Sequence, residues 1–139
     1  MSTTYIPTEL RRRVRERAGN CCEYCKIREI TTLLGCEVDH IISEKHGGLT
    51  IESNLALACF ECNRAKGSDL GSYLTAEATQ LTRFFHPRWD DWTVHFLYQP
   101  TGELVGLTPE GIVTARLFDF NRSIRVAERV ALNLRGLYP

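Results

Sequence analysis

Residues 36–67, CEVDHIISEKHGGLTIESNLALACFECNRAKG, decide the fold that we expect for this chain. The apolar run CEVDHII predicts a strand, and SEKHGGLT predicts a loop in which Gly47 and Gly48 supply the positive backbone angles of a tight return. NLALAC predicts a second strand, and CFECNRAKG predicts a helix that ends near Gly67 or Gly71. The expected order is therefore strand, loop, strand and helix.

The first predicted strand carries two neighbouring polar residues, Asp39 and His40. Adjacent side chains of a strand point to opposite faces, so one of the two is expected to face inward. A hydrogen-bonded structural pair and a functional pair both fit this position. The cysteines and asparagines around the strand favour the functional pair.

Two C-x-x-C pairs flank the strand–loop–strand segment, and they consist of Cys22, Cys25, Cys59 and Cys62. Two such turns can place four thiolates around one ion, and soft sulfur ligands suit zinc. A thioredoxin-like redox pair fits poorly, because there are two pairs and no βαβ pattern around either. Cys21 is an alternative ligand, but the two-residue spacer favours Cys22; Cys36 is expected to be a small buried side chain. We therefore expect a structural zinc ion that clamps the base of the segment.

A second metal site is expected where the predicted helix begins, because Asn63 directly follows Cys62. If this helix packs across the strands, Asp39 and Asn63 can approach one cation, and their oxygen atoms suit Mg²⁺ or Mn²⁺. His40 would then face an incoming water as a general base. Asn54 would hold the loop and orient the imidazole through hydrogen bonds. Taken singly, Asn54 also fits a turn and Asn63 a helix start.

The stretches RRRVRERAGNCCEYC and CEVDHIISEKHGGLTIESNLALACFECNRAKG, within residues 11–67, resemble the HNH endonucleases, the zinc-clamped branch of the ββα-metal (His-Me finger) nucleases. The resemblance implies an α+β fold with a ββα-metal core and a metal-dependent DNA endonuclease that hydrolyses phosphodiester bonds with one metal ion. It implies that His40 is the general base and Asn54 the central asparagine, both catalytic. It implies that Asp39 and Asn63 hold the catalytic Mg²⁺ or Mn²⁺, and that the four paired cysteines hold structural Zn²⁺.

The chain departs from the family pattern at its last position. Asn63 stands where the name-giving final histidine is found, and Gly67 stands where some members carry a further histidine ligand. A D-H…N…N arrangement also occurs among active members, including phage junction-resolving nucleases. The change weakens binding of soft metals and points to magnesium, with two protein ligands for the ion.

Residues 1–20 are expected to contain a helix that is capped by Thr8 and ended by Gly19. Residues 21–70 are the predicted HNH core and residues 71–139 a C-terminal extension, all in a single domain. The extension looks similar to one found on uncharacterised bacterial HNH proteins, which implies no activity.

The extension is expected to form a β-hairpin and two helices. The hairpin turns at PTGE and places an alternating aromatic and aliphatic set on one face, namely Trp92, Val94, Phe96 and Tyr98. The helices are expected to begin at Thr108 and Asn121. The aromatic side chains, with Trp89, fit a core better than base stacking.

The expected partner is double-stranded DNA. The net charge is zero, with seven Lys/Arg against four Asp/Glu in residues 1–35 and three against six in residues 36–70; chance explains this asymmetry as well as a DNA-facing site does. The candidate contacts with phosphates are Arg11, Arg15, His46, Lys66 and Arg88. Solvated surface positions are the alternative for the helix arginines, His46 and Lys66.

Composition and apolar run lengths favour a cytoplasmic protein with no membrane-spanning segment. The rival function is a noncatalytic zinc-stabilised module that binds nucleic acid or a protein partner, including a partner nuclease.

Overall fold

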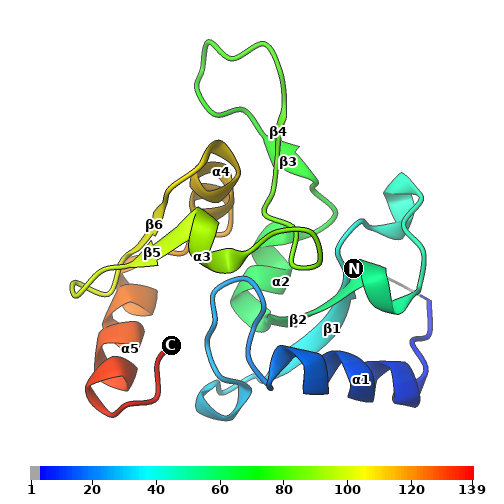
Figure 1. Ribbon diagram of the computed structural model, residues 1–139, viewed down its shortest axis with the longest axis horizontal. Helices are drawn as coiled ribbons and strands as arrows, with labels where there is room; N and C mark the ends of the chain where they lie inside the picture. Colours follow the sequence, from blue (N-terminus) through cyan, green and yellow to red (C-terminus); the bar gives the residue numbers. More distant parts are fainter. Residues whose placement is uncertain (1–3) are drawn as a thin grey trace. The chain divides into compact units, whose positions relative to one another are not determined.

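The computed structural model describes residues 4–139, which form two compact units. The first unit ends at Asp69 and the second runs Leu70–Pro139 (Figure 1). This boundary lies beside the predicted limit between core and extension; that the units make a single domain stays a prediction. The mixture of helices and strands confirms the predicted α+β class. Within residues 4–139, none of the helices combines the length and the apolar character needed to cross a bilayer.

The first unit contains the predicted strand, loop, strand and helix. Strand β1 (Cys36–His40) pairs antiparallel with β2 (Leu55–Cys59), and Cys36 lies opposite Cys59. Helix α2 (Phe60–Lys66) follows β2 directly and ends at Gly67, as predicted. We call the pair of strands the ribbon.

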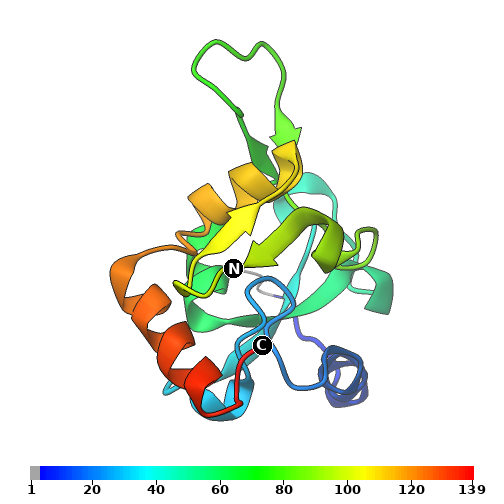
Figure 2. The same cartoon turned by 60° about the vertical axis from the view of Figure 1, so that its left-hand side comes forward.

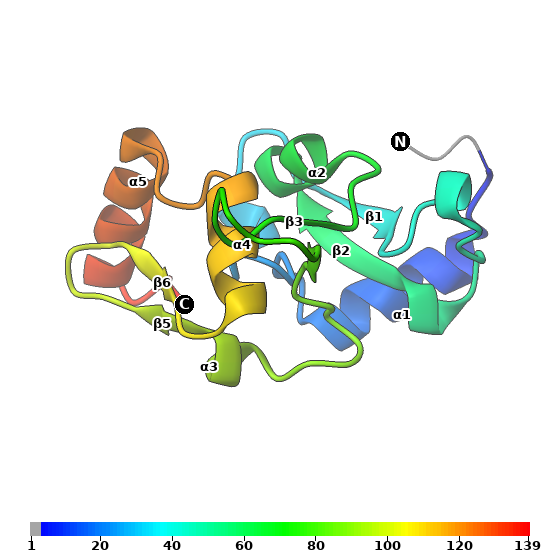
Figure 3. The ribbon, with the colours of Figure 1, turned by 90° about the horizontal axis from the view of Figure 1, so that it is seen from above.

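The ribbon lies between helix α1 (Thr8–Ala18) and α2 (Figures 1 and 3). All five residues of β2 are buried, because a helix covers each side of the strand. This burial explains why the sequence LALAC is apolar throughout instead of alternating. Ala56 and Ala58 lie opposite Asp39 and Glu37, and their small side chains leave room for α2 on that face.

Helix α1 differs from the prediction at its start. Thr8 is its first residue, Pro7 takes the capping position, and no side chain caps the helix. Gly19 ends the helix at φ 62° as predicted, in the left-handed conformation that glycine adopts without strain. The first three of residues 1–20 lie outside the described part of the chain.

Charged side chains close the open edge of β1. In an antiparallel strand each residue directs its N–H and C=O to one side, alternately toward and away from the partner strand. The outward N–H of Cys36 donates to Glu29 at 3.0 Å, and its carbonyl accepts from Arg15 at 3.0 Å. Arg15 also donates to the Glu29 carboxylate at 3.1 Å, so helix, loop and strand are joined at this point.

The open edge of β2 is closed in the same way. The outward N–H of Leu57 donates to the Glu23 carboxylate at 2.9 Å, and its carbonyl accepts from the Glu23 N–H at 2.8 Å. Arg17 of α1 donates to the carbonyl of Leu55 at 2.5 Å. At these positions the backbone groups of the ribbon edges therefore have the partners that burial requires.

The loop between the strands depends on two glycines for different reasons. Gly47 has a φ of 84° and ends the short helical turn Glu44–His46, as the prediction required. Gly48 does not have a positive φ, so the expectation of two such angles is wrong for it. A Cβ at Gly48 would lie 1.7 Å from the carbonyl oxygen of Ile42, so glycine is needed there for close approach.

The second unit consists of short strand pairs and helices (Figure 2). The strand pairs are β3 (Gly71–Ser72) with β4 (Thr82–Arg83), and β5 (Phe96–Tyr98) with β6 (Leu104–Gly106). The helices are α3 (Trp92–His95), α4 (Pro109–Leu117) and α5 (Ser123–Leu134). The β5–β6 hairpin and the helices α4 and α5 confirm the predicted hairpin plus two helices, whereas β3, β4 and α3 were not predicted.

The predicted alternation of side chains from Trp92 to Tyr98 is wrong over its first half. Trp92 and Val94 lie in α3, a single helical turn, because the Asp91 side chain accepts a hydrogen bond from Thr93 N–H at 2.9 Å and caps that turn. Phe96 is in the core, whereas Val94 is exposed. A helix-capping aspartate therefore overrides the strand pattern.

The predicted start of α4 is confirmed, whereas the predicted start of α5 is wrong by two residues. Thr108 caps α4 by accepting from Gly111 N–H at 3.0 Å, as predicted. Helix α5 begins at Ser123 instead of Asn121, because the Asn121 side chain bonds to the N–H and C=O of Leu104 at 2.8 and 2.9 Å. The amide therefore ties β6 to the turn before α5 and does not cap the helix.

Helix α5 turns arginines inward. Arg125 donates to the carbonyl of Phe118 at 2.8 Å, and Arg129 donates to the carbonyl of Gly102 at 2.7 Å. The aliphatic side chains Ile124 and Leu134 are 68% and 83% exposed. Helix α5 therefore buries a face that carries arginine side chains and leaves these aliphatic side chains exposed.

Candidate functional site

The four paired cysteines converge at the base of the ribbon. Their sulfur atoms all lie within 4.8 Å of one another and are buried. Each pair forms the same tight turn, in which Cys25 N–H points to Cys22 Sγ and Cys62 N–H points to Cys59 Sγ, both at 3.5 Å. The four cysteines are positioned to bind a metal ion.

The spacing and the chemistry of the sulfur atoms are compatible with structural zinc. Tetrahedral zinc with Zn–S bonds of about 2.3 Å separates its sulfurs by about 3.8 Å, and Cys25 Sγ lies 3.7 Å from Cys59 Sγ. Hydrogen bonds that the Cys59 thiol donates to Cys22 and Cys25 raise its pKa, and burial raises the pKa of the Cys62 thiol. A bound cation would stabilise the thiolate forms that this environment otherwise disfavours.

The remaining cysteines lie outside the cluster. Cys21 places its sulfur 3.5 Å from the carbonyl of Gly19, and Cys22 rather than Cys21 belongs to the cluster of four sulfurs. Cys36 is buried in the first unit, as expected for a small apolar side chain.

One face of β1 presents carboxylates to the start of α2. Glu37 and Asp39 lie two residues apart and therefore on the same face. The Asn63 amide of α2 lies 3.5 Å from the Glu37 carboxylate. The predicted approach of α2 to this face is present, and it includes a carboxylate, Glu37, that the sequence analysis missed. The sequence signal for Glu37 is its position two residues before Asp39 in a predicted strand, because this spacing places both carboxylates on one face.

His40 points to the opposite face from Asp39, and its ring is 1% exposed. Its Nε2 lies 2.8 Å from Thr50 Oγ1 and 3.7 Å from the Glu44 carboxylate. Its Nδ1 is buried and has no hydrogen-bond partner within residues 4–139. One ring nitrogen is therefore held in place and the other is available to accept a proton. No sequence signal connects Thr50 with His40, because ten positions separate them.

Asn54 ties the two ends of the loop together. Its side chain accepts from Ile42 N–H and donates to the carbonyls of Ile42 and Leu49, each at 2.9 Å. The predicted hold on the loop is present, but these bonds reach the loop backbone and not the imidazole. Asn54 thus fixes Leu49. The next residue, Thr50, contacts His40.

The segment that holds these residues matches a known family. Residues 22–69 match the family described as HNH endonuclease. This segment belongs to the HNH endonuclease family. The match begins at the first paired cysteine and ends where the first compact unit ends. No curated protein matches the chain.

In the HNH domain, Asn54→Ala should lower the free energy of unfolding by about 1–3 kcal/mol, because the part-buried Ile42 N–H loses its acceptor. Urea unfolding of the zinc-loaded protein measures this loss. Ser53→Ala, at an exposed neighbouring position, is the control and should leave stability within about 0.5 kcal/mol. Equal midpoints for the two variants would show that the asparagine does not hold the loop.

The residues predicted to contact DNA differ in how exposed their side chains are. Arg11 and His46 are exposed in the HNH-containing unit. Arg15 is bonded to Glu29 and to the edge of β1, so only its remaining N–H groups could meet a phosphate without breaking these bonds. Arg88 lies in the second unit, where its N–H donates to His86 Nδ1 at 3.1 Å. Their contacts with DNA stay predictions.

Lys66 differs most from the expectation. It is 3% exposed, so the alternative of a solvated lysine is wrong. Its ammonium donates to the carbonyl oxygens of His40 at 3.0 Å and of Gly67 at 3.4 Å. A phosphate would reach this group only if it left both carbonyls.

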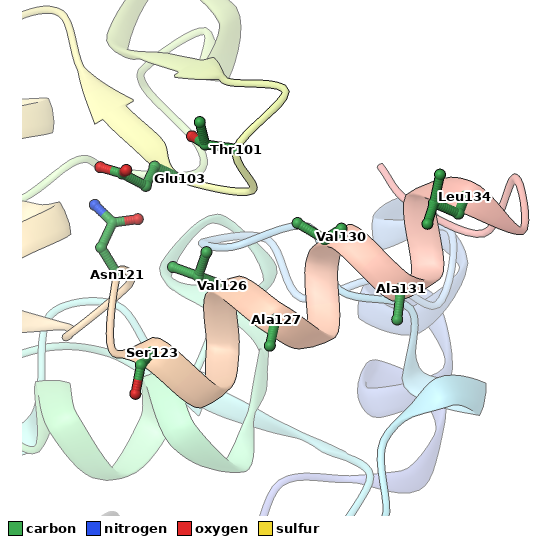
Figure 4. Close-up of a pocket in the computed structure, with 9 residues that line it drawn as sticks. All are labelled: Thr101, Glu103, Asn121, Ser123, Val126, Ala127, Val130, Ala131 and Leu134. Atoms are coloured by element: carbon green, nitrogen blue, oxygen red, sulfur yellow. The ribbon is translucent and has the colours of Figure 1, made fainter.

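The second unit has a hollow of about 610 Å³ along α5 (Figure 4). Val126, Val130 and Leu134 line it, and Glu103 is the one ionisable group among its described lining residues. A mostly apolar lining with one carboxylate offers no pair of groups for acid–base chemistry. The candidate site is therefore the HNH domain.

Proposed function

We propose that this chain is a metal-dependent DNA endonuclease that hydrolyses phosphodiester bonds. The observation that carries the proposal is the His40 ring, which holds Nε2 against Thr50 and leaves Nδ1 without a partner within an HNH domain. An oriented imidazole with one open nitrogen is what a general base requires.

Two metal sites belong to the proposal. The four paired cysteines would hold a structural Zn²⁺. Asp39 and Asn63 would hold a catalytic Mg²⁺ or Mn²⁺, and the presence of Glu37 on the same face supports a hard-cation site. When bound, the catalytic cation supplies positive charge that stabilises negative charge on the phosphate.

The protein's own residues would then manage the proton. In this mechanism His40 Nε2–H would donate to Thr50 Oγ1, 2.8 Å away, and Nδ1 would accept the proton of the attacking water. The Glu44 carboxylate, 3.7 Å from Nε2, stabilises the positive ring that results. Because the ring is 1% exposed, its surroundings must admit one water when DNA binds.

Double-stranded DNA is the proposed substrate. The exposed Arg11 and His46 are placed to meet its phosphates, and charge attraction of this kind dominates affinity for nucleic acid. Binding should therefore weaken as salt concentration rises.

The test is incubation of zinc-loaded protein with supercoiled, linear, branched and single-stranded DNA. We expect nicking of double-stranded DNA with Mg²⁺ or Mn²⁺, and none after EDTA treatment. Adding Zn²⁺ alone after EDTA restores the cysteine site without restoring cleavage, which separates the two metals. No cleavage of any of these DNAs by zinc-loaded protein with Mg²⁺ or Mn²⁺ would contradict the proposal.

The second candidate is a noncatalytic zinc-stabilised module that binds nucleic acid or a partner. The burial of the His40 ring favours it, because a general base must meet water. Such a module binds DNA without cutting it, and replacing His40 leaves its function unchanged.

A further inference from the structure

Lys66 brings a buried positive charge to the end of the strand that carries Asp39 and His40. Its ammonium donates to the His40 carbonyl at 3.0 Å and to the Gly67 carbonyl at 3.4 Å. A buried ammonium is costly unless its hydrogen bonds and its charge are compensated. The surroundings of Lys66 supply both kinds of compensation.

The hydrogen bond to His40 closes the edge of β1. Ile41 N–H donates to Asn54 O across the ribbon at 2.8 Å, so the His40 carbonyl, one residue earlier, points away from β2. Lys66 supplies the donor for this outward carbonyl, as Arg15 does for the carbonyl of Cys36 at the other end of the strand. The bond joins the last turn of α2 to the backbone of the proposed general base.

The charge of Lys66 also lies on the side of β1 that carries the proposed metal ligand. Asp39 shares with Glu37 the face of β1 that α2 approaches. Burial lowers the pKa of the Lys66 ammonium, and attraction to the carboxylates of Asp39 and Asp69 opposes that shift. A divalent cation at Asp39 would be repelled by the same ammonium.

We infer that Lys66 is a positioning residue: it holds the Asp39–His40 end of β1 against α2 and, by its charge, sets how tightly Asp39 and Asn63 bind a divalent cation. The inference rests on the proposed function for its effect on cleavage. Its effect on metal affinity is independent of cleavage. Replacing Lys66 should therefore change these two quantities in opposite directions. Loss of the hydrogen bond should slow cleavage, because the geometry of the site is disturbed. Loss of the positive charge should strengthen binding of the divalent cation.

The test compares Lys66→Met with Lys66→Arg in zinc-loaded protein. For Lys66→Met we expect kcat at saturating Mg²⁺ to fall about tenfold or more, since small misplacements of reacting groups cost this much or more. The Mg²⁺ concentration for half-maximal cleavage should fall several-fold, and Mn²⁺ should bind several-fold tighter by calorimetry. Lys66→Arg keeps the charge and should keep the wild-type Mn²⁺ affinity.

Arg64→Met is the matched control, because Arg64 is exposed on the same helix and its replacement removes the same charge. It should change neither kcat nor Mn²⁺ affinity appreciably. A Lys66→Met protein that is loaded with zinc and has wild-type kcat and Mn²⁺ affinity would overturn the inference. A fall in the cleavage rate at low Mg²⁺ that saturating Mg²⁺ fully restores would also overturn it, because kcat would then be unchanged and only metal binding would have weakened.

Two further outcomes are informative. If the Lys66→Met protein does not retain zinc, Lys66→Gln is used in its place. We then expect the Lys66→Gln protein to bind Mn²⁺ more tightly than the Lys66→Arg protein. Equal Mn²⁺ affinities of these two variants would overturn the inference. If the wild type does not cleave DNA, the proposed function fails, and Mn²⁺ calorimetry alone decides whether Lys66 tunes the metal site.

Discussion

Replacing His40 with alanine should slow DNA cleavage by about 10²- to 10⁴-fold, the usual contribution of a general base. Within residues 4–139, the buried Nδ1 of the ring has no hydrogen-bond partner, and its other nitrogen lies 2.8 Å from Thr50 Oγ1. Single-turnover cleavage with saturating Mg²⁺ measures the effect. DNA affinity, measured separately, should change little, because the ring is buried.

The alanine variant leaves a cavity the size of an imidazole, which allows a sharper test. Added imidazole should restore part of the lost rate in His40→Ala and should not speed the wild type. A structural role for the ring predicts lost zinc or lost DNA binding and no such rescue. Cleavage at the wild-type rate by a folded His40→Ala protein would remove the enzyme proposal and leave the binding module.

Replacing Cys62 with serine should unfold the HNH domain. Structural zinc in small domains contributes about 10–16 kcal/mol of apparent binding free energy, which is larger than the stability of most domains. Cys62 is fully buried and stands directly before Asn63, so its loss releases both the metal and the start of α2. Zinc content should fall from one ion per chain to none, and the amides of β1 and β2 should lose protection from hydrogen exchange.

Cys21→Ser is the matched control for this experiment, because Cys21 lies beside the cluster without belonging to it. It should keep one zinc ion and wild-type exchange rates. Removal of the metal from the wild type with a chelator should reproduce the Cys62→Ser result. A Cys62→Ser protein that keeps its ribbon protected without zinc would show that the metal does not hold the fold.

Much of the site could be predicted because its signals are local. Each C-x-x-C spacing lets one turn present two sulfurs, and Asn63 is placed by the cysteine that precedes it. Asp39 and His40 are neighbours in a strand, so their opposite directions follow from strand geometry. The ends of α1 and α2 were equally readable, since Gly19 and Gly67 stop both helices.

Other features could not be read because they depend on the register of the strands and the packing of the helices. Thr50 meets His40 only because the loop folds back, and Lys66 meets the His40 carbonyl only because α2 crosses the edge of β1. Arg15 and Lys66 were expected at a DNA surface, yet each bonds to an outward carbonyl of β1. The sequence does not indicate which unpaired backbone group a long basic side chain will reach.

The amino-acid sequence by itself determined the cluster of four paired cysteines, the strand–loop–strand–helix order and the polar residues that the strands and helix carry, because these follow from spacings of a few residues. Tertiary structure alone decided which groups surround the imidazole, which cations close the ribbon edges and which face of α5 is buried. These choices depend on backbone groups left open by a ribbon of two strands. Such groups take their partners from segments that are distant in sequence, and only the folded chain brings them within hydrogen-bonding distance.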